Sequence, residues 1–232
     1  MNKYKHLFFD LDRTLWDFDT NNTETFRELY AHFQLEALGV EEVTAFYKKY
    51  QKINLALWDA YKKAEITKKD LNFQRFYQSL LLYTIDNAEL ATRMGAYYVK
   101  ESPLKTHLYP HTLETLEKLH RKYQMHIITN GFDEVQYIKM ENSGLMRFFD
   151  KIITSEAAGY KKPDKRIFEY ALQQAGATVQ ESIIIGDDPE ADIYGACLVG
   201  MDQIWVKHLP LKPELTRATY SVNELKEITA IL

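Results

Sequence analysis

An apolar segment that runs directly into two carboxylates limits what this chain can fold into. The segment HLFFDLDRTLWDFD begins at His6, and its apolar run meets Asp10 and, two positions later, Asp12. Alternate residues of an extended segment point to the same side, so the two carboxylates share one side of the chain. An unpaired charge is costly to bury. We therefore expect a buried strand here, with both carboxylates standing at its carboxyl end.

Five short apolar runs have the character of strands, at residues 6–11, 125–129, 151–155, 182–186 and 203–207. Each is nearly continuous rather than alternating, which is typical of parallel strands that are covered on both faces. From residue 108 onward these runs alternate with helical patterns, and a short helix is expected in the last twelve residues. This order predicts an α/β fold with a doubly wound parallel sheet.

The long interval between the first and second strands has helical patterns almost throughout. We expect helices at residues 23–34, 41–63, 68–83 and 87–100. Thr67 and Asp70 have the spacing of a capping box at the start of the third. The pattern predicts two domains: an α/β domain formed by residues 1–15 and 104–232, and a helical domain formed by residues 16–103 inserted after the first strand.

Composition bears on location and partners. The net charge of −4 disfavours binding to a nucleic acid polymer. The single cysteine, Cys197, permits no internal disulfide and suits a reducing compartment. No stretch approaches the roughly 20 apolar residues of a membrane span, and the first residues lack the apolar run of a signal peptide. We therefore expect a cytoplasmic protein with a small-molecule substrate. No pattern in the sequence defines an oligomeric state.

Polar clusters follow four of the five predicted strands. They consist of Asp10, Asp12 and Thr14; Thr129, Asn130 and Gly131; Lys162 with Pro163; and Asp187, Asp188 and Asp192. Each cluster alone is more typical of a turn or a helix start than of a site. Ligands of open parallel sheets bind outside the carboxyl ends of the strands, however, so all four clusters should converge there. Together they predict an active site.

The acidic residues among them predict a metal site. Asp10, Asp12 and Asp187 would repel one another unless a divalent cation held them, and oxygen ligands alone favour Mg²⁺. A carboxylate beside Mg²⁺ can attack phosphorus and form an aspartyl-phosphate. The metal and Lys162 would then neutralise the charge on the transferred group.

The remaining residues suit the handling of phosphate and protons. Thr129 can donate a hydrogen bond to a phosphoryl oxygen, and backbone N–H groups after Asp10 and around Asn130 can complete the cradle. Asp12 is well placed to protonate a leaving oxygen and later to deprotonate a water molecule.

The segments DLDRT, TNG, KP and GDDPEAD resemble the four motifs of the haloacid dehalogenase (HAD) superfamily of phosphohydrolases. The resemblance spans essentially the whole chain, because the helical insertion resembles a C1-type cap. It implies a HAD-like Rossmannoid core in which Asp10 is the nucleophile, Asp12 the general acid/base, Thr129 the phosphate-binding hydroxyl and Lys162 the stabilising lysine. It also implies that Mg²⁺ is bound by Asp10, Asp187 and the backbone carbonyl of Asp12.

Three further positions concern this resemblance. Asp188 and Asp192 are candidates for contacts behind the metal ligands, with direct contact left open. Family members usually carry glycine or another small residue where Arg13 stands. That departure removes no catalytic atom, but it could alter the cap hinge or the mouth of the site.

Longer segments, including ITNGFDEVQ, KPDKRIFEYALQQAG and YSVNELKEI, resemble pyrimidine 5′-nucleotidase-like members. This implies substrate binding by Thr129, Asn130 and Gly131, with a nucleotide base contacted by the cap. Asn54 and Trp58 are four apart on a predicted helix and share a face, so the indole could stack on a pyrimidine and the amide could bond its edge. Alternatively, Trp58 packs in the cap core, or Trp16 and Phe18 form the pocket wall.

Other functions stay open to different degrees. A dehalogenase needs no acid for a leaving alcohol, so Asp12 argues against it. A HAD phosphatase or phosphomutase acting on a sugar phosphate or phosphoglycolate is the main alternative. A phosphonate hydrolase would need a Schiff-base lysine from the cap. Phospho-accepting receiver domains also place Asp, Thr and Lys at strand ends, but they lack the helical insertion.

Overall fold

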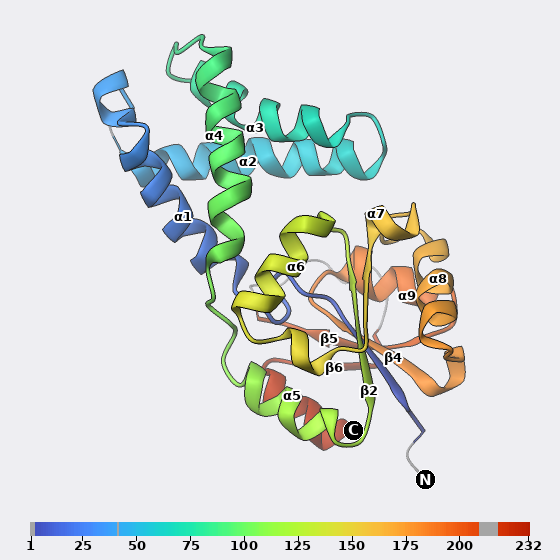
Figure 1. The fold of residues 1–232 in the computed structure, drawn as a ribbon. Coiled ribbons are helices and arrows are strands. Elements are labelled where there is room, and N and C mark those ends of the chain that lie inside the picture. The colour runs from blue at the N-terminus through green and yellow to red at the C-terminus, as the bar shows by residue number, and fades with distance from the viewer. Residues whose placement is uncertain (1–2, 41, 209–217) are drawn as a thin grey trace. The chain divides into compact units, whose positions relative to one another are not determined.

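The computed structural model describes residues 3–40, 42–208 and 218–232. The chain forms two compact units (Figure 1). The first comprises Met1–Phe18 and Thr106–Leu232, and the second comprises Asp19–Lys105. Within the described ranges, no helix is both long enough and apolar enough to cross a membrane. The roles of the two units as catalytic core and cap stay a prediction.

The first unit is built on a six-stranded sheet in the order β3-β2-β1-β4-β5-β6, and every neighbouring pair is parallel. The strands are β1 His6–Phe9, β2 Gln124–Thr129, β3 Lys151–Thr154, β4 Ser182–Gly186, β5 Asp202–Val206 and β6 Tyr220–Val222. The chain winds outward from β1 in both directions, which confirms the doubly wound α/β fold.

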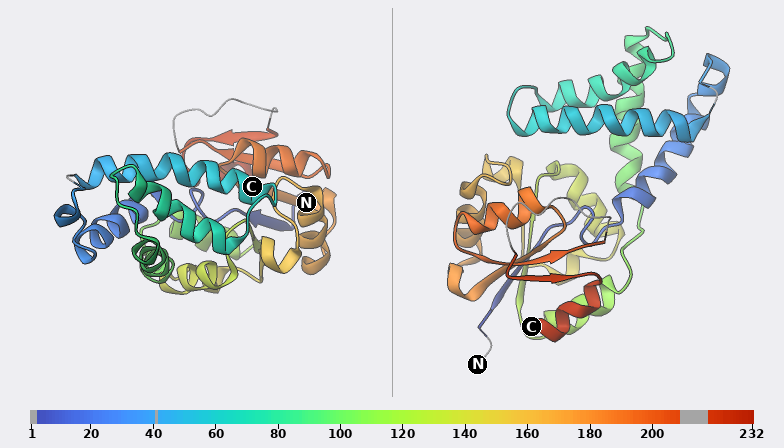
Figure 2. Two further views of the ribbon diagram at one scale, coloured as in Figure 1. Left: turned by 90° about the horizontal axis from the view of Figure 1, so that it is seen from above. Right: turned by 180° about the vertical axis from the view of Figure 1, so that it is seen from behind.

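Helices of the first unit cover both faces of this sheet (Figure 2). The helices are α5 Thr112–His120, α6 Asp133–Asn142, α7 Ser155–Ala158, α8 Lys165–Ala175, α9 Gly195–Cys197 and α10 Ile228–Ile231. Single turns are formed by η3 Met146–Phe148, η4 Val179–Glu181 and η6 Leu225–Glu227, and η5 Pro189–Tyr194 is a π-helix.

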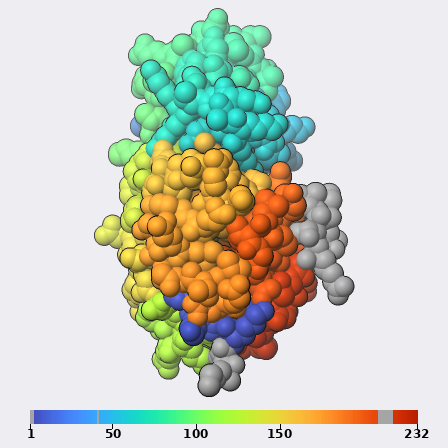
Figure 3. Space-filling view, turned by 90° about the vertical axis from the view of Figure 1, so that its right-hand side faces the viewer, coloured from blue at the N-terminus to red at the C-terminus, as the bar shows by residue number. Residues whose placement is uncertain are grey.

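Alternation along β1 divides the core into two layers. Leu7 and Phe9 pack in a cluster with residues of α5, α6 and α10, whereas Phe8 packs on the opposite face with residues of α8 and α9. Both faces of the central strands are therefore buried, which explains their continuous apolar runs. On the outside of this unit, the chain through α7 and α8 (yellow to orange) adjoins the chain around α9 (orange-red) on one surface (Figure 3).

Two local features differ from expectation. The segment predicted as a terminal helix begins with the edge strand β6, and helical turns start only at Leu225. β6 is three residues long and mostly exposed, so it lacks the apolar run by which the other strands were predicted. β1 ends at Phe9, earlier than residue 11, although Asp10 N still bonds the backbone oxygen of Ile185; the turn that follows begins at Leu11, whose backbone oxygen accepts from Thr14 N.

The second unit is helical, and α1 Phe18–His32 enters it from the first. It contains α2 Val43–Lys62, α3 Lys68–Leu81, α4 Ala88–Glu101 and the short turns η1 Leu35–Leu38 and η2 Ser102–Leu104. Thr67 and Asp70 form the expected capping box. Residue 41, the expected start of the second helix, lies outside the described residues, and Glu42 caps α2 by accepting bonds from two backbone N–H groups.

Aromatic packing holds this unit together. The ring centroid of Phe26 in α1 lies 4.3 Å from that of Tyr50 and 6.0 Å from that of Phe76. α1 begins earlier than predicted even though asparagine is a poor helix former. Asn22 is buried and its side chain accepts a hydrogen bond from the Tyr98 hydroxyl, so tertiary contacts outweigh local propensity.

Two buried histidines on β1 and β2 should make the protein sensitive to acid. His6 Nδ1 lies 3.2 Å from His126 Nε2, and both rings are buried. Burial lowers the pKa of His126 to about 4, assisted by His6 and Lys151 and opposed by Asp150. Burial also lowers the pKa of His6, with Lys5 acting in the same sense and Glu181 and Asp150 opposing it.

The folded protein keeps these histidines neutral, whereas the unfolded chain binds a proton at each of them below the ordinary histidine pKa of 6.5. The protein therefore loses stability as the pH falls from 6.5 toward 4. We expect the free energy of unfolding to fall over this window by up to about 1.4 kcal/mol per pH unit for each histidine involved. Urea denaturation at several pH values measures the slope. The His126→Leu variant should have a shallower slope, and an unchanged slope would contradict this account.

Candidate active site

A buried lysine joins the first and last polar clusters of the sequence. Lys162 Nζ donates to Asp10 Oδ1 at 2.7 Å, to Asp192 Oδ1 at 2.6 Å and to the backbone oxygen of Ile128 at 2.8 Å. Lys162 is 2% exposed and Asp10 is 7% exposed. Three elements that are distant in sequence therefore meet at one ammonium group at the carboxyl ends of β1, β2 and β4.

Asn130 fixes the backbone of that lysine. Its side-chain oxygen accepts from Lys162 N at 2.8 Å, and its Nδ2 donates to Lys162 O at 3.0 Å. The asparagine side chain of the TNG segment is thus occupied within the protein. A role for Asn130 in binding substrate through its backbone stays a prediction.

Charge balance governs the protonation of this group. Burial raises the pKa of Asp10 to about 7, and Asp192 and Asp12 act in the same sense, while Lys162 opposes them. Burial lowers the pKa of Lys162, but the carboxylates of Asp10 and Asp192 outweigh it, so the net shift is upward and the lysine stays protonated. Further positive charge beside Asp10 would favour its ionised, nucleophilic form.

Three carboxylates form a cluster that could hold a metal ion. Asp10, Asp187 and Asp192 each offer an oxygen, and these oxygens lie within 4.8 Å of one another. The donors are all oxygens, which suits a hard divalent cation. The Asp12 carboxylate is not part of this cluster, and the contact expected through its backbone carbonyl stays a prediction.

The π-helix η5 delivers Asp192 into the cluster. Asp192 Oδ2 accepts a hydrogen bond from Asp188 N at 3.0 Å. A Cβ atom on Gly186 would lie 2.3 Å from that same oxygen, so only glycine leaves room for this approach. The next residue after Gly186 is Asp187, whose backbone oxygen accepts a hydrogen bond from Trp205 Nε1 at 3.0 Å. The GDDPEAD segment is therefore held by the bond from Trp205 of β5 and by its own internal bond between Asp188 and Asp192.

Asp12 contacts two residues that sequence reasoning missed, and both lie on α6. Gln136 Nε2 donates to Asp12 Oδ2 at 2.9 Å, and Lys139 Nζ lies 2.5 Å from Asp12 Oδ1. Gln136 Nε2 also donates to Thr129 Oγ1 at 2.7 Å. The two residues are three apart and so share a helix face, but their burial cannot be read from a helix with such a polar sequence.

The segment around Arg13 adopts an unusual backbone conformation. Arg13 has a φ of 67°, in the region that favours glycine, and its guanidinium lies 4.3 Å from the Phe18 ring centroid. Thr14 Oγ1 donates to Asp10 Oδ2 at 3.2 Å. Trp16 is completely buried in the core of the first unit, which leaves it no exposed face for a substrate.

The remaining two predicted site residues, Asn54 and Trp58, lie on α2 in the second unit. Asn54 Oδ1 accepts from the Tyr50 hydroxyl at 3.4 Å. Trp58 is half-buried and meets Tyr61 edge to face at 5.6 Å. Tyr61 is buried, so this contact is compatible with the alternative that Trp58 packs in the cap core, and both alternatives stay predictions.

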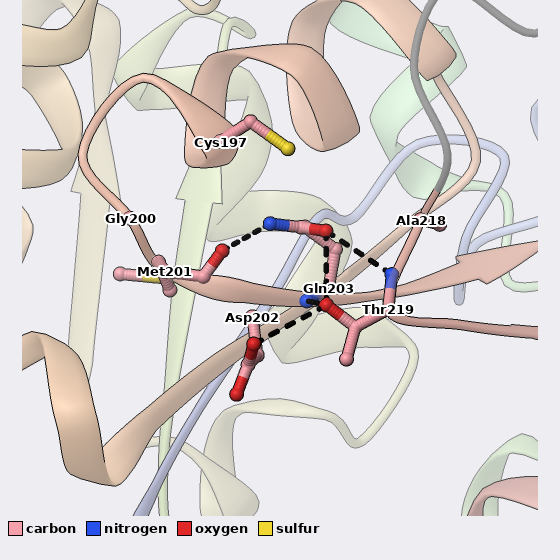
Figure 4. Close-up of a pocket in the computed structure, with 7 residues that line it drawn as sticks. All are labelled: Cys197, Gly200, Met201, Asp202, Gln203, Ala218 and Thr219. Carbon is pink, nitrogen blue, oxygen red and sulfur yellow. Dashed lines mark hydrogen bonds between the residues drawn. The ribbon is translucent and has the colours of Figure 1, made fainter.

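A cavity of about 450 Å³ lies elsewhere in the first unit, lined by Cys197, Gly200, Met201, Asp202, Gln203, Ala218 and Thr219 (Figure 4). It is at the amino end of β5, whereas the carboxylates stand at the carboxyl ends of the strands. Gln203 crosses it, donating to the backbone oxygen of Met201 and accepting from Thr219 N. This cavity contributes nothing to the carboxylate cluster.

The fold and the site together define an α/β protein with a doubly wound parallel sheet and a cluster of aspartates at the carboxyl ends of its strands. A family model described as haloacid dehalogenase-like hydrolase matches residues 7–206. The chain therefore belongs to the haloacid dehalogenase-like hydrolases.

Individual relatives cover nearly the entire chain. The pyrimidine 5′-nucleotidase YjjG of Escherichia coli is 31% identical over 99% of this chain and 98% of its own. A glyceraldehyde 3-phosphate phosphatase of Methanothermobacter thermautotrophicus is 32% identical over 92% of this chain and 88% of its own. The crystal structure of YfnB from Bacillus subtilis, described as bound to magnesium, has a TM-score of 0.87 and 27% identity, and covers 100% and 99% of the two chains.

The Lys162 ammonium group should be essential for stability. Lys162→Met leaves Asp10 and Asp192 buried without their shared cation, and breaking a buried ion pair in this way costs about 3–5 kcal/mol. Urea denaturation at neutral pH measures the loss. Lys165→Met is the matched control, because Lys165 is exposed and its partner Glu169 lies 3.7 Å away. Equal stability of the two variants would show that the buried network is not stabilising.

Proposed function

We propose that this protein is a Mg²⁺-dependent phosphomonoesterase of the cytoplasm that acts through an aspartyl-phosphate on Asp10. The observation that carries the proposal is the Lys162 ammonium group, which pairs with two members of the carboxylate cluster, Asp10 and Asp192. Such a cluster suits a bound cation and a transferred phosphoryl group together. The magnesium described for YfnB supports the choice of metal.

The first step forms the aspartyl-phosphate. A carboxylate oxygen of Asp10 bonds to phosphorus as the bond from phosphorus to the leaving oxygen breaks, and Asp12 gives its proton to that oxygen. Lys162 and the Thr129 hydroxyl stabilise the negative charge on the phosphoryl oxygens. Mg²⁺, when bound, would supply further positive charge there.

The second step releases phosphate. Asp12, now a carboxylate, takes a proton from a water molecule whose oxygen bonds to phosphorus. The bond between phosphorus and Asp10 breaks, which restores both carboxyl groups to their starting states. Asp12 thus serves as acid and then as base, and a fixed position near the leaving oxygen suits both tasks.

We propose pyrimidine nucleoside 5′-monophosphates as the substrates. The full-length similarity to YjjG supports this class. Trp58 is only half-buried and lies four residues after Asn54 on α2, which supports a contact of both side chains with the base. A second candidate is a small sugar phosphate, which the similarity to a glyceraldehyde 3-phosphate phosphatase favours.

Activity should depend on both Asp10 and the metal. Asp10→Asn removes the nucleophile with almost no change in volume, so hydrolysis of p-nitrophenyl phosphate should vanish, as it should in excess chelator. Restoring Mg²⁺ should restore activity only to the wild type. Asp150→Asn serves as a control at an exposed aspartate of the same unit. Substantial turnover by Asp10→Asn, or in excess chelator, would refute the mechanism.

A substrate screen with one cap variant tests the nucleotide proposal. Wild-type kcat/KM should be highest for pyrimidine monophosphates among nucleotides, sugar phosphates and phospho-acids. Stacking on a base contributes about 1–3 kcal/mol, so Trp58→Ala should raise KM for dUMP roughly 5- to 150-fold. Leu82→Ala, at an exposed apolar residue of the same unit, is the control.

Two outcomes would separate the alternatives. If Trp58→Ala loses thermal stability and impairs dUMP and p-nitrophenyl phosphate alike, Trp58 is structural. If the wild type hydrolyses sugar phosphates far faster than any nucleotide, the nucleotidase proposal is wrong and the general phosphatase proposal stands.

A further inference from the structure

Both oxygens of the Asp12 carboxylate accept hydrogen bonds from side chains of one helix, α6. Gln136 and Lys139 lie on the same face of α6, and each bonds a different oxygen, Oδ2 and Oδ1 respectively. Gln136 is completely buried and Lys139 is 3% exposed. A carboxylate bonded at both oxygens cannot rotate about its terminal bond without losing a contact, so its orientation is set by α6.

The same amide also controls Thr129. Thr129 Oγ1 accepts from Gln136 Nε2 at 2.7 Å and from Gly131 N at 3.1 Å. A hydroxyl has two acceptor lone pairs and one donor hydrogen. With both acceptor sites occupied, the hydrogen of Thr129 is directed away from these donors. It is therefore available for a phosphoryl oxygen.

Gly131 makes this arrangement possible. A Cβ atom at position 131 would lie 1.8 Å from Gln136 Nε2 and 2.4 Å from its Cδ. No side chain could occupy that space while Gln136 bonds Thr129 and Asp12. The glycine of the TNG segment thus has a steric reason, which differs from the substrate contact expected from the sequence.

The hydrogen bonding of the Gln136 amide indicates that this side chain serves Asp12 and Thr129 rather than the packing of the core. Its Oε1 atom is buried and has no hydrogen-bond partner among the described residues, whereas its Nε2 makes two bonds. An amide buried only for packing should satisfy both ends. Here the donor end is satisfied at the expense of the acceptor end, and the donor end faces the two residues that handle the proton and the phosphate.

Lys139 is similarly committed. Its ammonium group lies 4.2 Å from the centroid of the Trp16 ring and is paired with Asp12. A buried lysine is unfavourable unless it is paired, and Asp12 is the carboxylate that pairs with it among the described residues. The aromatic ring and the ion pair together restrict where the ammonium group can lie.

We propose that Gln136 and Lys139 are positioning residues that hold Asp12 and Thr129 in the geometry needed for proton transfer and phosphate binding. This inference rests on the proposed phosphatase function. It assigns to α6 a part in the reaction, although neither residue touches the reacting atoms.

The test compares leaving groups. An alkoxide leaving from dUMP needs a proton from Asp12, whereas p-nitrophenolate leaves readily without one. The value of kcat/KM reports the step that breaks this bond. Misplacing a catalytic group can cost on the order of 10²-fold. Lys139→Met and Gln136→Met should therefore lower kcat/KM for dUMP by about that factor, and for p-nitrophenyl phosphate only a few-fold.

Two further measurements exclude a merely structural role. In an Asp12→Asn background, Lys139→Met should cause no further change in the ratio of the two kcat/KM values, because the lysine acts through that carboxylate. Gln136→Met should also weaken inhibition by inorganic phosphate, whereas Lys139→Met should not. Lys139→Arg should restore part of the ratio. Lys118→Met is the matched control, since Lys118 pairs with Glu114 at 2.7 Å on the exposed face of α5.

The outcomes are distinguishable. If the wild type hydrolyses no phosphomonoester, the proposed function fails. If it hydrolyses glycerol 2-phosphate but not dUMP, the same comparison is made with glycerol 2-phosphate. The positioning role is wrong if the wild type is active but the variants lower kcat/KM equally for both substrates. It is also wrong if Lys139→Met still changes the ratio of the two kcat/KM values in the Asp12→Asn background. Should the methionine variants fail to fold, Lys139→Gln and Gln136→Glu give the same ratio test.

Discussion

The contact on which the site depends is the Lys162 ammonium group, buried between Asp10, Asp192 and the backbone oxygen of Ile128. It brings together the ends of β1 and β2 and the π-helix after β4. Without it, two carboxylates would be buried a few ångströms apart with no compensating charge. Much of the surrounding detail serves this contact: Asn130 holds the lysine backbone, and Gly186 makes room for Asp192.

Parallel strand order explains why four distant segments can meet there. β1 lies near the middle of the sheet and pairs with both β2 and β4, so the carboxyl ends of these three neighbouring strands lie side by side at one edge of the sheet. Asp10 N still bonds the backbone oxygen of Ile185, which keeps the first carboxylate beside the strand that leads to Asp187. The buried apolar strands thus fix the position of charged groups that could not pack together by themselves.

The sequence was sufficient for the parts of the molecule that depend on local pattern. The bounds of β4 were predicted at both ends, and the capping box at Thr67 was confirmed, because an apolar run and a cap are local signals. The early start of α1 and the two α6 contacts to Asp12 were missed. They depend on which polar side chains are buried by distant elements, as Asn22 is by Tyr98, and no local pattern carries that information.

Two carboxylates placed two residues apart at the end of a buried strand are tolerated because each has its own lysine. Asp10 is balanced by Lys162, from the segment before α8, and Asp12 by Lys139, from α6. Separate cations let the two groups differ in chemistry although they are neighbours in sequence. Asp10 shares its lysine with Asp192 of the carboxylate cluster, which suits the proposed nucleophile beside a metal. Asp12 is held by an amide and an ammonium group, one at each oxygen, which fixes its position for the proton transfer proposed for it.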